Sequence, residues 1–185
     1  MDLGIRVPTG LPIRDVALFI KKCEDAGFTG AGVVDHQHSS RDVFITLALA
    51  ATRTSSIRLY PAVSNPITRH SMVLASLAYS LEELAPGRIM IPLGAGFHSV
   101  RNINHAQATV SDMRKVITQT QQLLKGESVY PGITEGKMTR LHPNPPPIYV
   151  SATGLKMTKL VGEIGDGGFL MVGVHPDNIL KAKTL

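Results

Sequence analysis

Six times along this sequence, a short apolar run is followed by a stretch whose apolar residues recur at helical spacing. The predicted strands cover residues 3–7, 30–34, 57–64, 88–93, 148–151 and 168–172. The predicted helices cover residues 13–26, 41–52, 71–84, 110–125, 155–164 and 176 onward. A helix between two strands brings the chain back to the same end of the sheet, so the strands run parallel. The alternation therefore predicts an α/β fold with a parallel sheet.

The alternation alone leaves two architectures open, a doubly wound open sheet and a β/α barrel. The predicted strands are rich in Val, Ile and Leu without strict alternation, which suits burial on both faces. The segment Val7-Pro8-Thr9-Gly10 after the first strand lacks the glycine spacing of a dinucleotide-binding fold. These patterns favour a barrel slightly. We expect residues 1–185 to form a single domain, with the irregular residues 126–146 as an excursion on its outside.

Charge and cysteine content argue against several classes of protein. The net charge is +5, but Lys and Arg are scattered and form no basic run, so no nucleic-acid binding is expected. No run of eighteen apolar residues occurs and the first residues carry no basic leader, which favours a cytoplasmic protein that does not enter a membrane. The single cysteine, Cys23, falls in an apolar helical pattern and is expected to be packed.

In a parallel barrel, catalytic groups lie at the carboxyl ends of the strands. Asp35 and His36 follow the second predicted strand. A histidine there can exchange a proton near neutral pH, with the aspartate orienting its ring. The other interpretation is a loop in which both side chains satisfy backbone groups. No metal site is expected at His36 and His38, because no third ligand with suitable spacing is nearby.

Three further strand ends carry residues suited to ligand contact. Ser64 and Asn65 follow the third strand, where they either hydrogen-bond a ligand or form a turn. Ala95 and Gly96 follow the fourth, where the small residues either let a flat ligand approach the backbone or make a tight turn. Residues 151–154 follow the fifth and lead into a helix, whose first turn either binds phosphate or is simply capped.

These same stretches resemble the luciferase-like family of flavin and deazaflavin oxidoreductases. The motifs that carry the resemblance are residues 4–8, 24–28, 35–36, 64–70, 84–88 and 93–96. They extend over nearly the whole chain. Within the family, the spacing of the first three units is most similar to the methylenetetrahydromethanopterin reductases and other deazaflavin-dependent members.

The resemblance implies a TIM-type (β/α)8 barrel, of which this chain would supply about six units. It implies a deazaflavin cofactor, coenzyme F420, or FMN at the carboxyl mouth, and a non-prolyl cis peptide near residues 62–64. It implies His36 and Asp35 as catalytic residues. The implied cofactor contacts are Ser64, Asn65, Ala95, Gly96, Ala152 and Gly154. Its implied partners are a small-molecule substrate and further copies of the chain in a homo-oligomer.

Two residues depart from the pattern of the methylenetetrahydromethanopterin reductases. Arg6 replaces a glutamate in the first strand, and Phe97 replaces an acidic residue after the glycine motif. Both family positions face the substrate, so Arg6 and Phe97 are the expected substrate contacts. An arginine there suits an anionic substrate, or else points elsewhere.

The function that the resemblance implies is hydride transfer between a flavin or deazaflavin and a small organic molecule. One alternative is an FMN-dependent monooxygenase. Another is a barrel that binds cofactor without turnover, or an inert truncated one, because the resemblance accounts for only six of eight units. Six parallel strands would leave two open edges, so either the chain is a fragment or another chain completes it.

Overall fold

The computed structural model describes residues 2–8, 10–130, 132 and 136–184. Its strands are β1 Gly4–Arg6, β2 Gly30–Val33, β3 Arg58–Pro61, β4 Ile91–Leu93, β5 Ile148–Ala152 and β6 Gly167–Leu170. Its helices are α1 Ile13–Asp25, α2 Val43–Ala51, α3 Ser71–Leu84, α4 His98–Arg101, α5 Val110–Leu124, α6 Leu155–Ile164 and α7 Pro176–Lys183. A short 3-10 helix, η1, covers Gln37–Ser39. The predicted alternation of strands and helices is confirmed.

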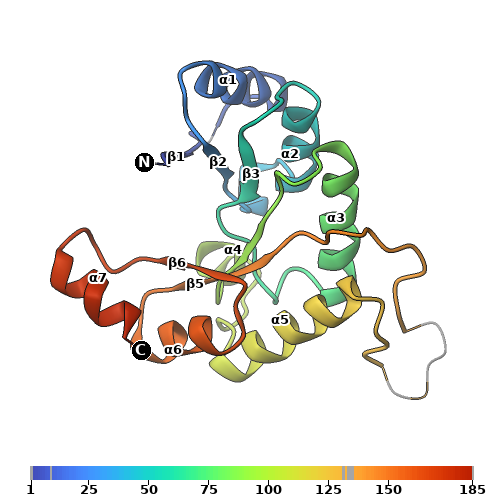
Figure 1. Ribbon diagram of the computed structural model, residues 1–185, viewed down its shortest axis with the longest axis vertical. Helices are drawn as coiled ribbons and strands as arrows, with labels where there is room; N and C mark the ends of the chain where they lie inside the picture. Colours follow the sequence, from blue (N-terminus) through green and yellow to red (C-terminus); the bar gives the residue numbers. More distant parts are fainter. Residues whose placement is uncertain (1, 9, 131, 133–135, 185) are drawn as a thin grey trace.

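Every strand pairing is parallel, and the strand order follows the sequence (Figure 1). One sheet has the order β1-β2-β3 and the other β4-β5-β6, and isolated parallel bridges at Leu59–Ile89 and Ser64–Leu93 join them. A doubly wound sheet reverses its strand order at a switch point, whereas the wall of a β/α barrel does not. The parallel α/β fold is therefore confirmed. No closed barrel is formed by the residues that the structure describes.

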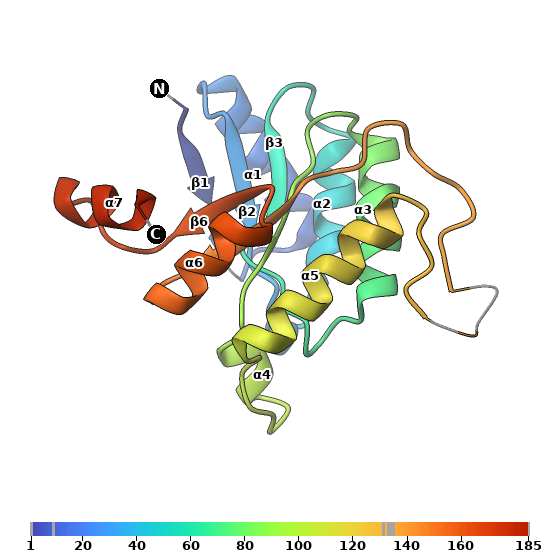
Figure 2. The ribbon, with the colours of Figure 1, turned by 60° about the horizontal axis from the view of Figure 1, so that its bottom comes forward.

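The helices pack in succession along one side of the strands (Figure 2). Neighbouring helices contact each other in the order α1, α2, α3, α5, α6. The core between helices and strands contains fully buried Leu47, Leu59, Leu74, Ile91 and Ile117. α1 is amphipathic and presents Val16, Ala17, Ile20 and Cys23 to this core, so the expected packing of Cys23 is confirmed. Burial of this apolar face fixes the helices on the convex side of the strands.

The other face of the strands is filled by aromatic rings that lie against glycines. A Cβ atom at Gly32 would lie 2.6 Å from Cε2 of Tyr60, and one at Gly4 would lie 2.7 Å from its hydroxyl. Tyr60 meets Phe169 edge to face at 5.3 Å between ring centroids, and Phe169 meets Tyr149 at 5.8 Å. Since β3 and β6 are not neighbours in the strand order, these contacts require the strands to curve around a shared interior.

Some details differ from the sequence-based predictions. The third strand ends at Pro61 rather than residue 64, because proline has no donor for the ladder. A cis peptide bond joins Ala62 to Val63, at the place that the family resemblance implied. η1 and α4 lie in segments predicted to be loops. The predicted excursion 126–146 contains no helix or strand in its described part; residues 131 and 133–135 lie outside it.

The last helix differs from the others in its packing. α7 has no buried residue, and its Leu180 is well exposed. Figure 2 shows it beyond the end of β6, away from the succession of helices. No helix in the described part of the chain is long and apolar enough to cross a membrane.

Candidate active site

A cleft of about 620 Å³ opens at the carboxyl ends of the strands, above the aromatic interior. This volume is within the range of small-molecule sites in proteins. The residues that line it are Arg6, Val34, Asp35, His36, Val63, Gly94, Ala95, Gly96, Phe97, His98, Ser99, Gln107, Ser151, Thr153, Met157 and Met171. They come from both sheets, so the cleft depends on the curvature that brings the two sheets together.

Strand alternation explains which side chains reach the cleft. Side chains two residues apart on a strand point to the same face. Arg6 follows Gly4 by two residues, and Val34 follows Gly32 by two; both glycines face the interior ring of Tyr60. Arg6 and Val34 therefore point to the interior side, nearer the carboxyl ends. Arg6 makes no ion pair with any residue that the structure describes.

Residues 94–96 give the cleft a wall made of backbone. A Cβ atom at Gly94 would lie 2.9 Å from Cγ2 of Val63. Gly96 has a φ of +81°, and a Cβ atom there would lie 2.3 Å from Cγ2 of Val100. Neither position accepts a larger residue without movement of its neighbours. Only the methyl group of Ala95 projects from these three residues, so a flat ligand can lie close to this backbone.

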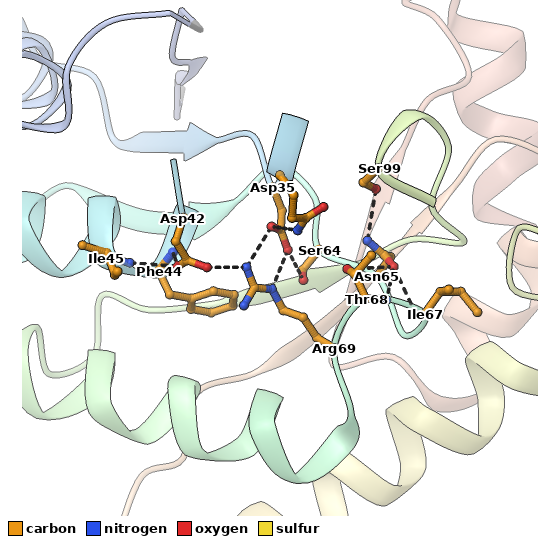
Figure 3. A network of polar contacts seen from close by, with 11 residues as sticks. Asp35, Asp42, Phe44, Ile45, Ser64, Asn65, Ile67, Thr68, Arg69 and Ser99 are labelled. Carbon is orange, nitrogen blue, oxygen red and sulfur yellow. Dashed lines mark hydrogen bonds and ion pairs between the residues drawn. The ribbon is translucent and has the colours of Figure 1, made fainter. Parts of the chain in front are cut away.

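A buried ionic network lies behind the cleft (Figure 3). Arg69 donates from Nε to Oδ2 of Asp35 at 2.8 Å and from Nη2 to Oδ1 at 3.0 Å. Its Nη2 also donates to Asp42 at 2.8 Å, and the hydroxyl of Ser64 donates to Asp35 at 2.6 Å. The guanidinium lies 4.7 Å from the ring centre of Phe44. One arginine thus joins the ends of β2 and β3 to the start of α2.

The charges of this network are mutually stabilised. Burial alone would lower the pKa of Arg69, but the carboxylates of Asp35 and Asp42 outweigh burial and raise it. Burial would raise the pKa of Asp42, yet the bonds from Arg69 and from the first amides of α2 hold that pKa below its usual value. Asp42 is also the N-cap of α2. Asp42 is therefore held as an anion by a guanidinium that keeps its charge.

His36 lies beside this network without joining it through its ring. The oxygens of Asp35 receive hydrogen bonds from Arg69, Ser64 and Gln37, and none within the described residues from the ring of His36. The expected orientation of His36 by Asp35 is therefore wrong, because other donors occupy that carboxylate. Nε2 of His36 instead lies 3.2 Å from Nδ2 of Asn102.

The structure brings together six of the residues predicted to form the site. Arg6, Asp35, His36, Ala95, Gly96 and Phe97 all line the cleft. Ser64 and Asn65 are buried beside it; Ser64 bonds to Asp35, and Asn65 bonds to Ser99 and to the backbone of Thr68. Their side chains hold the loops in place and do not line the cleft.

The fifth strand places its polar residues differently from the expectation. Ala152 is buried away from the cleft, and Gly154 is the N-cap of α6. Ser151 and Thr153 line the cleft in their place. These two share the interior face with Tyr149, because they follow it by two and four residues. Ala152 and Gly154 belong to the segment that borders the cleft, but neither is among its lining residues, and their role as cofactor contacts stays a prediction.

Several lining residues were not among the predicted contacts, although Gly94, Ser151 and Thr153 lie in strand-end segments that were named as candidates. The full set is Val34, Val63, Gly94, His98, Ser99, Gln107, Ser151, Thr153, Met157 and Met171. Strict two-residue alternation along the strands would have identified Ser151 and Thr153. His98 and Ser99 belong to the short helix α4, whose four residues leave no periodic signal.

Comparisons with known proteins place the chain among related sequences. Residues 1–183 match the profile of the family described as luciferase-like monooxygenase. The chain is 30% identical over 185 residues to 5,10-methylenetetrahydromethanopterin reductase of Methanolobus tindarius, covering 95% of the chain and 55% of that protein. It is 33% identical over 164 residues to the F420-dependent hydroxymycolic acid dehydrogenase of Mycobacterium tuberculosis, covering 78% and 45%.

A solved structure agrees with these matches. The coenzyme F420-dependent tetrahydromethanopterin reductase of Methanopyrus kandleri superimposes with a TM-score of 0.76 at 26% identity, covering 91% of this chain and 55% of that one. The chain thus spans about half the length of the curated relatives it matches.

Proposed function

The chain belongs to the luciferase-like monooxygenase family, and on that premise we propose that it forms most of a β/α barrel that transfers hydride between coenzyme F420 and a small organic substrate. The observation that carries this proposal is its 30% identity, over 95% of its length, to a methylenetetrahydromethanopterin reductase. A second relative, at 33% identity, is named as F420-dependent. The cleft at the strand ends is where β/α barrels place their active sites.

The shape of the cleft fits a flat tricyclic ring. The backbone of residues 94–96 forms one wall, where a Cβ atom would collide with Val63 or Val100. Met157 and Met171 add apolar surface to the lining. Residues 94–96 and Val63 would therefore hold the ring of the coenzyme. When bound, the deazaflavin would supply or accept the hydride.

The side chains of the cleft have separable roles in this proposal. His36 exchanges the proton that accompanies hydride transfer. Nε2 of His36 lies 3.2 Å from the amide nitrogen of Asn102, and its Nδ1 makes no hydrogen bond within the described residues. Asp35 is a positioning residue, because its carboxylate ties the loop before His36 to Arg69.

The proposal also requires further β/α units to complete the barrel. The strand order β1 to β6 is the order of a barrel wall, and the chain covers about half of its relatives' length. We infer that two further β/α units close the circle between β6 and β1. In that arrangement Arg6 and Met171, at the two ends of the wall, face the same interior.

A fluorescence titration tests the proposal. The purified chain is titrated with F420 and, separately, with FMN. We expect saturable quenching of F420 fluorescence and weaker binding of FMN, by about tenfold or more. Tighter binding of FMN would favour the monooxygenase alternative, which the description of the family also supports. Binding of neither would contradict a cofactor site in this chain.

Variants of two histidines test the role of His36. His36→Ala should retain F420 binding, because the ring of His36 is not part of the backbone wall. Once a substrate has been identified, the variant should show no turnover of that substrate. His105→Ala is the matched control, since His105 is exposed and does not line the cleft. Full turnover in the His36→Ala variant would contradict the proton-transfer role.

A further inference from the structure

The two charged side chains that line the cleft differ in their partners. The lining contains one arginine, Arg6, and one carboxylate, Asp35. Asp35 is saturated from behind by Arg69, which contributes two hydrogen bonds to it. The side chain of Asp35 is only 1% exposed, and that of Arg69 is 12% exposed. Asp35 therefore already has a charged partner before any ligand arrives, whereas Arg6 has none among the residues that the structure describes.

The polar groups near the mouth are mainly hydrogen-bond donors or can act as donors. The rings of His36 and His98 lie 6.3 Å apart between centroids. Ser99 and Thr153 contribute hydroxyl groups to the same lining. No carboxylate other than that of Asp35 lines the cleft in the described part of the chain. A ligand group placed here meets donors and positive charge.

Part of the lining is apolar and exposed. Phe97 is 52% exposed and Met171 is 69% exposed, and both border the cleft. An exposed aromatic ring and thioether beside a cleft mark a surface on which an apolar group can pack. The cleft therefore offers a positive charge at Arg6 and an apolar surface at Phe97 and Met171. A ligand with an anionic group and an apolar body would match both.

Resting on the proposed function, we propose that the ligand that completes this cleft is an organic anion. Its carboxylate or phosphate binds Arg6, and its apolar body packs against Phe97 and Met171. The guanidinium of Arg6 can form a two-pronged hydrogen bond with either anionic group. The anionic group belongs either to the substrate or to the coenzyme, and both sources present the same chemistry to Arg6.

The test uses small probes with and without charge. Benzoate and phenyl phosphate are titrated into the 15N-labelled chain at constant ionic strength, with benzyl alcohol as the neutral match. Amide shifts of residues 94–96 and 151–153 report binding. We expect both anions to bind about tenfold more tightly than benzyl alcohol, the size expected from one charge-assisted hydrogen bond. Equal binding of benzoate and benzyl alcohol would overturn the proposal.

Substitutions assign the effect to Arg6. Arg6→Ala should weaken both anions about tenfold and leave benzyl alcohol unchanged, whereas Arg6→Lys should fall between the two proteins. Arg14→Ala is the control, because Arg14 is an exposed arginine of α1 outside the cleft. The amide spectra also show whether each variant is folded. Unchanged anion binding in folded Arg6→Ala protein would overturn the proposal.

A titration with F420 in the presence of phenyl phosphate separates the two sources of the anion. Competition assigns the anionic group to the coenzyme, and simultaneous binding assigns it to the substrate; both support an anion site at Arg6. If F420 binds while the anions do not, this inference fails and the proposed function stands. If the anions bind through Arg6 while F420 does not, the anion site stands and the proposed function fails.

Discussion

The two sheets that border the cleft are held in place by different means. Behind the first sheet, ion pairs join Arg69 to Asp35, which is buried, and to Asp42, which is partly exposed, across three segments of the chain. At the second sheet, Ser151 and Thr153 make no side-chain hydrogen bond within the described residues. The first wall of the cleft is therefore set by the chain itself, whereas the second leaves surface for a ligand or further chain to cover.

The largest expected effect comes from removing the arginine of the network. Arg69→Met leaves Asp35 and Asp42 without their shared partner. Loss of one partner from a buried ion pair destabilises a protein by about 3–5 kcal/mol, and protonation of the carboxylates relieves part of this cost. We expect the free energy of unfolding, measured by urea titration, to fall by about 3 kcal/mol.

The control for that variant is Arg14→Ala, which removes an exposed arginine of α1 and should change the free energy of unfolding by less than about 0.5 kcal/mol. A loss below about 1 kcal/mol in Arg69→Met would mean that the network does not hold the first wall.

The second prediction compares two carboxylates that accept hydrogen bonds from backbone amides at the starts of strands. Glu24 accepts from the amides of residues 55, 56 and 57 ahead of β3. Burial would raise its pKa, but these hydrogen bonds outweigh burial and lower it from 4.5 to about 2. Asp166 accepts from the amide of Ile148 at the start of β5, and it is exposed.

Because the folded protein lowers the pKa of Glu24, its contribution is complete above pH 4.5 and is lost as the pH falls toward 2. The shift corresponds to about 3 kcal/mol, since one pKa unit is about 1.4 kcal/mol. Glu24→Gln should flatten the fall in stability over this pH range. Asp166→Asn should cost less than about 1 kcal/mol at neutral pH. Equal effects of the two variants would contradict the contrast between the sheets.

The third prediction concerns the backbone wall of the cleft. Gly96→Ala places a Cβ atom against Val100 at a residue with positive φ. We expect F420 affinity to fall by about tenfold, with a loss of stability of about 1–2 kcal/mol. Gly162→Ala, on α6 with open space around its Cα, should leave F420 affinity unchanged. Unaltered affinity in Gly96→Ala would place the ring elsewhere.

The smallest expected effect is at the end of the second sheet. Leu180 of α7 is 65% exposed, and α7 buries no residue. Leu180→Gln should therefore change the free energy of unfolding of this chain by less than about 0.5 kcal/mol. A loss above about 1.5 kcal/mol, measured in the same urea titrations, would show that α7 is packed in solution.

The contrast also explains what the sequence could and could not predict. The helices and strands follow from local periodicity. The cis peptide between Ala62 and Val63 followed from the family resemblance. The pairing of Asp35 with Arg69 joins residues 34 positions apart, so no local pattern reveals it. The sequence analysis instead expected Asp35 to orient the ring of its neighbour His36. The family resemblance selected Ala152, whose role stays a prediction, whereas Ser151 is the residue that lines the cleft; two-residue alternation from Tyr149 distinguishes the two.

One measurement tests the central claim most directly, a crystal structure of the chain with F420. The account predicts electron density for the ring against the backbone of residues 94–96 and beside Val63, with His36 facing its edge. Density for the ring at another surface, or an empty cleft in crystals grown at saturating coenzyme, would contradict the assignment of this cleft as the coenzyme site.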